Sequence, residues 1–196
     1  MRRAYPTGLV SLLLVVALLA FGGALSGTNR AAAAASGGYW LVDSDGSVYD
    51  FAGAPRLTVP TRNSTAPVVG MAATPDGLGY WLADTNGKVT AVGSAPGLGS
   101  ASGVRHVVAI AATPSGKGFW LATATGDVLP FGDAGRHGSM AGVPLNKPVV
   151  GMAGTPSGRG YWLVATDGGI FSFGDAPFFG SAAGRSASPV VSASGA

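Results

Sequence analysis

Residues 155–177 read TPSGRGYWLVATDGGIFSFGDAP, and this stretch is the fullest copy of a unit that fills the chain after its first three dozen residues. Each copy contains one tryptophan, and successive tryptophans are separated by 41, 39 and 42 residues. They are Trp40, Trp81, Trp120 and Trp162. Spacing is constant inside the unit and varies only between units. This predicts one folding module repeated four times, with insertions confined to the connecting loops.

Each unit has the pattern of an antiparallel sheet. Apolar runs of four to six residues are separated by Gly, Pro, Asp and Asn, and no helical period of useful length follows the first 35 residues. The first run (68–73, 107–112, 149–154) leads through a Thr-Pro-Asp/Ser-Gly turn to the run that contains the tryptophan. An Asp-Gly or Asn-Gly hairpin signal precedes the third run, and a short fourth run such as 178–180 ends the unit. We therefore expect an all-β protein, a β-propeller of four four-stranded blades.

The two ends of residues 36–196 predict how the propeller closes. The first repeat starts at its tryptophan-containing run, whereas residues 189–195 resemble a first run that has no successor. If this C-terminal strand pairs with the first blade, the ring closes with four blades and no open sheet edge. The alternative is a shortened member of a longer array, which pairs with a second copy to finish a larger ring.

Residues 1–35 have the features of a secretory signal peptide. A basic start at Arg2 and Arg3 is followed by an apolar block (9–25), expected to be helical, and by an alanine run (31–35) suited to cleavage. The apolar block is also close to the ~18–20 residues that cross a bilayer, so an uncleaved membrane anchor is the competing interpretation. Both interpretations place residues 36–196 outside the cytoplasm, secreted or associated with the cell envelope.

Composition excludes several classes of partner. Three of the 12 basic residues lie in the leader, which leaves nine against nine acidic residues, all of them aspartate. A near-neutral module does not favour nucleic acid or an anionic membrane surface, so membrane contact is expected only through an uncleaved leader. The chain has no cysteine, and an exported protein of this kind cannot rely on disulfides.

The repeat resembles a known type. Residues 160–176 (GYWLVATDGGIFSFGDA), preceded by 148–156 (PVVGMAGTP), resemble the ~40-residue repeats of secreted actinobacterial proteins, which are themselves similar to RCC1-type and WD40-type propeller repeats. The likeness covers residues 37–196 and implies an extracellular binding or spacer module without catalytic residues in the repeat. Two copies depart from the pattern. Ala52 and Gly53 replace Gly174 and Asp175, and Gly135 replaces Pro177, so these copies could turn differently.

We interpret the tryptophans and the turn aspartates as structural residues. An indole face can stack on a sugar, but a residue present once per repeat in an apolar strand is better explained as a packing anchor between repeats. Asp43 and Asp45 before a glycine suggest a calcium loop, yet Ala54 stands where the bidentate Glu would be, and the other copies lose ligands. We expect turn chemistry there and no metal or other cofactor.

Catalytic signals are weak. There is no Glu or Cys, and His106 and His137 fall at different places in their repeats. No nucleophile elbow, zinc-protease or phosphate-binding motif occurs. We therefore expect no catalytic residues. The alternative enzyme is a cell-wall or polysaccharide-acting hydrolase that uses two aspartates.

One set of loops carries positive charge. The connection from each fourth run to the next repeat brings a cation, and the second-to-third-run loops should lie on the same face. The residues of this candidate anion site are Arg62, Arg105, His106, Lys147 and Arg185. They could receive a phosphate or carboxylate of a cell-surface polymer, or they could simply be solvated or pair with neighbouring turn aspartates.

The sequence thus predicts a secreted, non-catalytic β-propeller that acts as a binding or scaffold module at the cell envelope. A cell-wall polymer or an extracellular protein is the expected partner, and the oligomeric state is left open. A truncated repeat array without independent function is the remaining alternative.

Overall fold

The computed structural model describes residues 38–60, 65–101, 103–185 and 188–190, and these residues form eleven β-strands. No helix within these ranges is long and apolar enough to span a membrane, and the predicted leader (1–35) lies outside them. The strands are β1 (Tyr39–Val42), β2 (Val48–Phe51), β3 (Val68–Ala73), β4 (Gly79–Asp84), β5 (Val89–Gly93), β6 (Val107–Ala112), β7 (Gly118–Thr123), β8 (Val128–Gly132), β9 (Val149–Gly154), β10 (Gly160–Ala165) and β11 (Ile170–Gly174).

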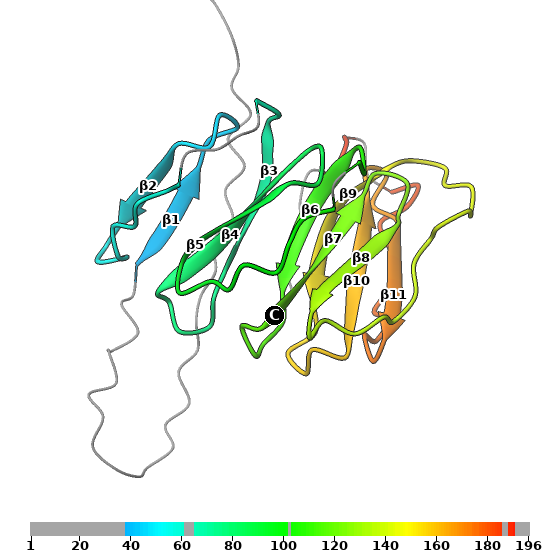
Figure 1. Cartoon of the computed structure of the whole chain (residues 1–196). Helices are drawn as coiled ribbons and strands as arrows, with labels where there is room; N and C mark the ends of the chain where they lie inside the picture. The colour runs from blue at the N-terminus through cyan, green and yellow to red at the C-terminus, as the bar shows by residue number, and fades with distance from the viewer. Residues whose placement is uncertain (1–37, 61–64, 102, 186–187, 191–196) are drawn as a thin grey trace, which may run out of the picture.

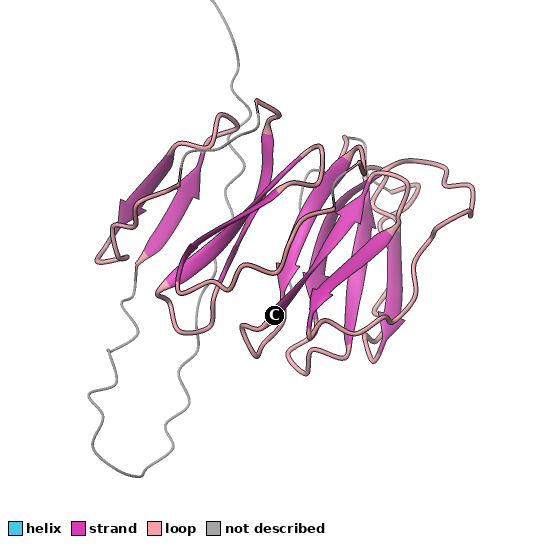
Figure 2. Cartoon of the chain, in the orientation of Figure 1, coloured by secondary structure: helices cyan, strands magenta, loops and turns pink. Residues whose placement is uncertain are grey.

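Each repeat forms its own antiparallel sheet, as Figures 1 and 2 show. The first sheet has two strands, β1 and β2, and the others have three, with the tryptophan-containing strand in the middle. The four-stranded blade predicted from the sequence is not formed in the described residues. The expected fourth run, including Phe178 and Phe179, is loop, and these two side chains are 62% and 86% exposed. The segments after β5, β8 and β11 are rich in Gly and Pro, and proline cannot donate to a ladder.

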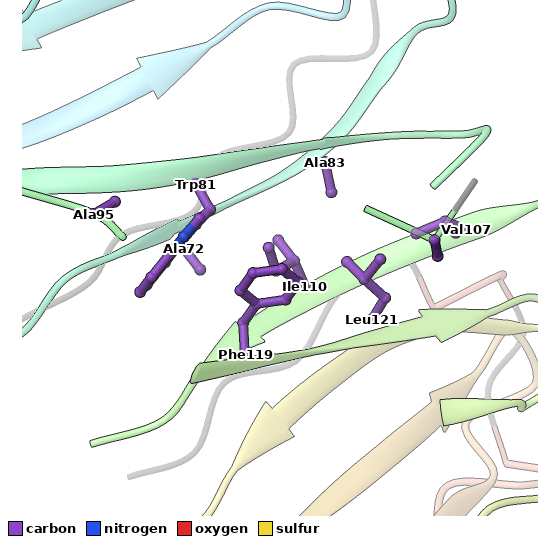
Figure 3. Packing of buried hydrophobic residues seen from close by; sticks show 9 residues of the cluster. Ala72, Trp81, Ala83, Ala95, Val107, Ile110, Phe119 and Leu121 are labelled. Carbon is purple, nitrogen blue, oxygen red and sulfur yellow. The ribbon is translucent and has the colours of Figure 1, made fainter. Parts of the chain in front are cut away.

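The sheets stand face to face in a row, and each interface between neighbours has its own hydrophobic core (Figure 1). Figure 3 shows the core between the second and third sheets, where Trp81 lies beside Ala72 and faces Ile110 and Phe119. We call the first strands of the second, third and fourth repeats the inner strands; they are β3, β6 and β9. Strand β6 contacts both β3 and β9, so the inner strands follow one another along the row. This sequential packing gives the all-β repeat architecture predicted from the sequence.

The first and fourth sheets lie at opposite ends of the row (Figure 1). Within the described residues, no strand pairing and no hydrophobic cluster joins β1–β2 to β9–β11. The described residues thus form a row of four sheets, and closure into a four-bladed ring stays a prediction. Of the segment predicted to close the ring, residues 191–196 lie outside the described residues. Val190 donates its N–H to the carbonyl of Thr166 at 2.8 Å, which ties this segment to the fourth repeat.

The turn after the third strand begins alike in all four repeats, with a residue in the left-handed conformation, and then differs in the first repeat. Gly174 ends β11 with a φ of 64°, and a Cβ built there would lie 2.0 Å from the carbonyl oxygen of Arg159, so only glycine fits. Ala52 occupies the corresponding position after β2 and adopts a φ of 53°. The next residue, Gly53, also has a positive φ of 89°, whereas the corresponding Asp175 does not. The first copy therefore turns differently from the others, as the sequence suggested.

Tyr80 and Tyr161 occupy corresponding buried positions and make a matched test of hydroxyl burial. The Tyr80 hydroxyl is buried and has no hydrogen-bond partner among the described residues, whereas the Tyr161 hydroxyl donates to the carbonyl of Gly138. We expect Tyr80→Phe to raise the free energy of unfolding by about 1 kcal/mol and Tyr161→Phe to lower it by about 1 kcal/mol, measured by urea denaturation. Phe119, at the same position of the third repeat, shows that the site accepts a phenyl ring.

A pH series separates the Tyr80 effect from general destabilisation. Burial, with a contribution from the charge of Asp50, raises the pKa of Tyr80 from 10.0 to about 12. Because the pKa is higher in the folded state, the neutral Tyr80 hydroxyl contributes to the free energy of unfolding. This contribution is complete below pH 10 and is lost as the pH rises through 12. The wild type should therefore lose stability over this range, and Tyr80→Phe should lose less. An equal alkaline loss in both proteins would contradict the assignment.

Candidate functional site

The candidate site lies at one end of the strands. This end carries the turns between the second and third strands and the loops that lead into the next repeat, and we call it the loop face. Here the turn between the second and third strands of one repeat accepts a hydrogen bond from the start of the next inner strand. Val68 N–H donates to the Ser44 carbonyl at 2.7 Å, and Val107 N–H donates to the Thr85 carbonyl at 3.1 Å. The connecting loops and the hairpin turns thus share one face, which is the arrangement on which the anion-site prediction depends.

The predicted cations are placed on this face wherever the structure describes them. Arg105, His106, Lys147 and Arg185 are exposed, and Arg62 lies outside the described residues. His106 adopts a φ of 61°, and its carbonyl accepts the N–H of Ala124 at 2.8 Å. This backbone bond attaches the connecting loop to the hairpin turn of the third repeat and leaves the imidazole outside.

Lys147 and Arg105 line two separate depressions. Lys147 lines an open depression of about 280 Å³ between the third and fourth repeats, together with Asp167 and Ser181. Arg105 lines a smaller depression of about 210 Å³ with Asn86. Within the described ranges neither cation forms an ion pair, whereas Arg159, near the other ends of the strands, lies 3.5 Å from the carboxylate of Asp175. The loop face therefore offers separate, solvated positive charges, each beside a polar turn.

The turn aspartates of the loop face accept hydrogen bonds from backbone N–H groups. Carboxylates accept an N–H from the residue two positions later in three of the hairpin turns: Asp45 from Ser47 at 2.8 Å, Asp84 from Asn86 at 2.9 Å and Asp167 from Gly169 at 2.9 Å. This is the Asx-turn role expected from the sequence. Among the described residues, no group of three or more His, Cys, Asp or Glu side chains could hold a metal ion.

The tryptophans lie between the sheets. Trp81 and Trp120 are fully buried, and Trp40 and Trp162 are partly buried. Every indole N–H donates to the carbonyl fifteen residues later, in the loop that follows the third strand. The acceptors are Pro55, Pro96, Gly135 and Pro177, at 2.9, 2.9, 2.8 and 2.7 Å. The indole faces of Trp81 and Trp120 are therefore closed to a sugar.

Sequence reasoning missed a polar network near the other ends of the strands. In the third repeat, the buried Thr113 hydroxyl lies 2.9 Å from the Asp133 carboxylate, to which Ser115 also donates at 2.6 Å. The fourth repeat contains the same trio, Thr155, Ser157 and Asp175. The second repeat has Thr74 with Asp76 and Ser94, so the Ser and the Asp have exchanged positions. This exchange between repeats is the signal that could have revealed the network.

Comparison with known proteins supports the fold and leaves the ligand open. No protein-family model and no curated protein matches the chain. Among solved structures, the chain is similar to the β-propeller domain of Cps50 (Swd1) from Myceliophteria thermophila, with a TM-score of 0.55 and 13% sequence identity. The match covers 78% of this chain and 54% of that domain, so the chain spans about half of the propeller to which it is similar. At this identity the likeness shows the fold alone, which is that of β-propeller blades.

Proposed function

We propose that the chain is an exported, non-catalytic β-propeller module that binds an anionic polymer of the cell envelope through its loop face. The observation that carries the proposal is the placement of Arg105, Lys147 and Arg185 on one face, solvated and without a carboxylate partner in the described part of the chain. Cations of this kind attract phosphate and carboxylate groups at long range. The leader pattern of residues 1–35 supports an extracytoplasmic site of action.

The contacts of five aspartates support a non-catalytic role. Asp133 and Asp175 are engaged with Thr and Ser, and Asp45, Asp84 and Asp167 accept backbone N–H groups. Hydrolysis by paired carboxylates requires one acid and one base or nucleophile on opposite sides of a scissile bond. Aspartates committed to turns and hydroxyl networks favour a scaffold over a hydrolase.

Removing the loop-face charges should weaken binding to an anionic polymer. We expect the triple variant Arg105→Gln, Lys147→Gln, Arg185→Gln to bind a phosphate-rich cell-wall polymer, such as teichoic acid, at least about tenfold more weakly at 50 mM salt. The measurement is sedimentation with purified cell walls or titration with the soluble polymer. Wild-type binding should also fall when the salt is raised to 500 mM.

The matched control removes three equally exposed cations outside the loop face. Arg56, Lys117 and Arg136 are exposed and lie in other turns and loops, so replacing them by glutamine gives the same net charge change. If both triple variants bind equally weakly, the attraction depends on net charge and the loop face is not the site. Binding that ignores salt would also overturn the proposal.

A further inference from the structure

The chain makes one inter-repeat contact three times, always with the same partners. The tryptophan of one repeat packs on the aromatic ring that stands directly before the tryptophan of the next repeat. The ring pairs are Trp40–Tyr80, Trp81–Phe119 and Trp120–Tyr161, with centroids 5.2, 5.5 and 5.5 Å apart. The receiving rings are sealed by this contact, because Tyr80 and Phe119 are 0% exposed and Tyr161 is 1% exposed.

The two ends of the row expose the two halves of this contact. Tyr39 of the first repeat stacks on Phe51 at 5.1 Å, as Phe119 stacks on Phe131 at 4.9 Å. No tryptophan covers this first pair in the described structure, so Tyr39 is 44% exposed and Phe51 is 41% exposed. At the other end, Trp162 is partly buried and has no aromatic neighbour within the described residues.

The backbone repeats the same complementarity. Val149 N–H donates to the Ala124 carbonyl of the preceding repeat, and this bond starts the inner strand β9. Val190 N–H makes the corresponding bond with Thr166 at 2.8 Å, so Pro189 and Val190 lie where the inner strand of a following repeat would begin. The first sheet, β1–β2, contains no inner strand among the described residues. The fourth repeat is thus followed by the start of an inner strand, which is the element that the first sheet lacks.

The length of the row, compared with a propeller, indicates which chain supplies the missing contact. The match covers 54% of the β-propeller domain to which the chain is similar, so the four sheets correspond to about half of that propeller. To bring Trp162 onto Tyr39 of the same chain, the row would have to bend about twice as sharply. A second copy meets both ends without such bending, because two half-rings related by a twofold axis make two identical head-to-tail contacts and close.

We propose that two copies of this chain associate head to tail into one propeller ring, with Trp162 of each copy packed on the Tyr39–Phe51 pair of the other. The result is a ring of eight repeats, which is within the range of known propellers. Closure removes the exposed aromatic side chains of both ends from water and leaves no open end on which further copies could add. The contact is independent of what the loop face binds.

The experiment is light scattering during size exclusion, with the chain expressed from its complete reading frame so that any processing is left to the cell. The wild type should have twice the mass of one chain at micromolar concentration. Trp162→Ala and Tyr39→Ala should each be monomeric under the same conditions, with the dissociation constant raised by more than about 30-fold. Val143→Ala is the matched control, because Val143 is an exposed apolar side chain (49%) in a loop between repeats, and this variant should remain a dimer.

Mixing the two monomeric variants tests the head-to-tail geometry. Trp162→Ala retains Tyr39, and Tyr39→Ala retains Trp162, so the mixture can form one intact contact and should recover association that neither variant shows alone. Circular dichroism of both variants should match the wild type, which separates lost association from unfolding. A monomeric wild type whose melting temperature is independent of concentration would overturn the proposal in favour of a closed four-repeat ring. Trimers, open polymers or a lack of recovery on mixing would also overturn the two-copy ring.

Discussion

Trp81→Ala should lower the free energy of unfolding by about 3–5 kcal/mol. Trp81 is 0% exposed and packs on Phe119 within the core between the second and third repeats (Figure 3). Its N–H also holds the carbonyl of Pro96 at 2.9 Å. Alanine leaves a cavity between two sheets and an unpaired carbonyl. Urea denaturation followed by circular dichroism measures the loss.

Two control variants separate packing from hydrogen bonding at this position. Trp81→Phe keeps an aromatic ring and removes the donor, so it should cost about 1–2 kcal/mol. Trp162→Ala removes an equivalent residue whose outer face has no aromatic neighbour in the described structure, and at low protein concentration it should also cost about 1–2 kcal/mol. If Trp81→Ala and Trp162→Ala cost the same, packing between repeats is not what the tryptophan contributes.

The strands of the repeat were predictable because each is marked by its own residues. The Trp spacing gave the period, and the Thr-Pro-Asp/Ser-Gly and Asp-Gly turns marked where each strand ends. The predicted fourth strand failed for a physical reason. Phe178 and Phe179 look like a short strand, but the backbone around them is held by the Trp162 indole and not by a ladder. A side chain that reaches fifteen residues ahead leaves no local pattern that a strand assignment could use.

The position of the candidate site followed from topology, whereas its detailed geometry did not. Alternating strand directions place the hairpin turns and the connecting loops at one end, so Arg105 and Lys147 had to share a face. Whether they converge depends on the angle between neighbouring sheets, which is set by packing of residues such as Trp120 on Tyr161. The sequence contains those residues but does not specify the angle, so it could not predict that Arg105 and Lys147 line separate depressions.

Exchanging Ser115 and Asp133 should restore stability that either single change removes, because the second repeat already contains the exchanged arrangement. Asp133→Ser takes the charged acceptor from the buried Thr113, and Ser115→Asp places a second carboxylate beside the first. Each single variant should cost about 1–2 kcal/mol. The double variant reproduces the chemistry of Asp76 and Ser94, whose hydroxyl and carboxylate oxygens lie 2.9 Å apart, and should return to within about 0.5 kcal/mol of the wild type. Additive losses in the double variant would mean that the two positions do not form a unit.

The networks also predict how the protein responds to acid. Burial acts to raise the pKa of Asp76, but hydrogen bonds from Thr74, the Leu78 N–H and Ser94 outweigh it, so the pKa is lowered. Hydrogen bonding by Ser157 is the main cause that lowers the pKa of Asp175. Because their pKa is lower in the folded state, the ionised carboxylates of Asp76 and Asp175 contribute to the free energy of unfolding. This contribution is present above pH 3.8, the ordinary pKa, and is lost as the pH falls below it. Unfolding free energy should therefore fall below about pH 4. Asp175→Asn should weaken this fall, because it removes a carboxylate whose pKa is lowered in the folded state. If Asp175→Asn and the wild type lose the same stability in acid, the Asp175 carboxylate is not a source of the acid response.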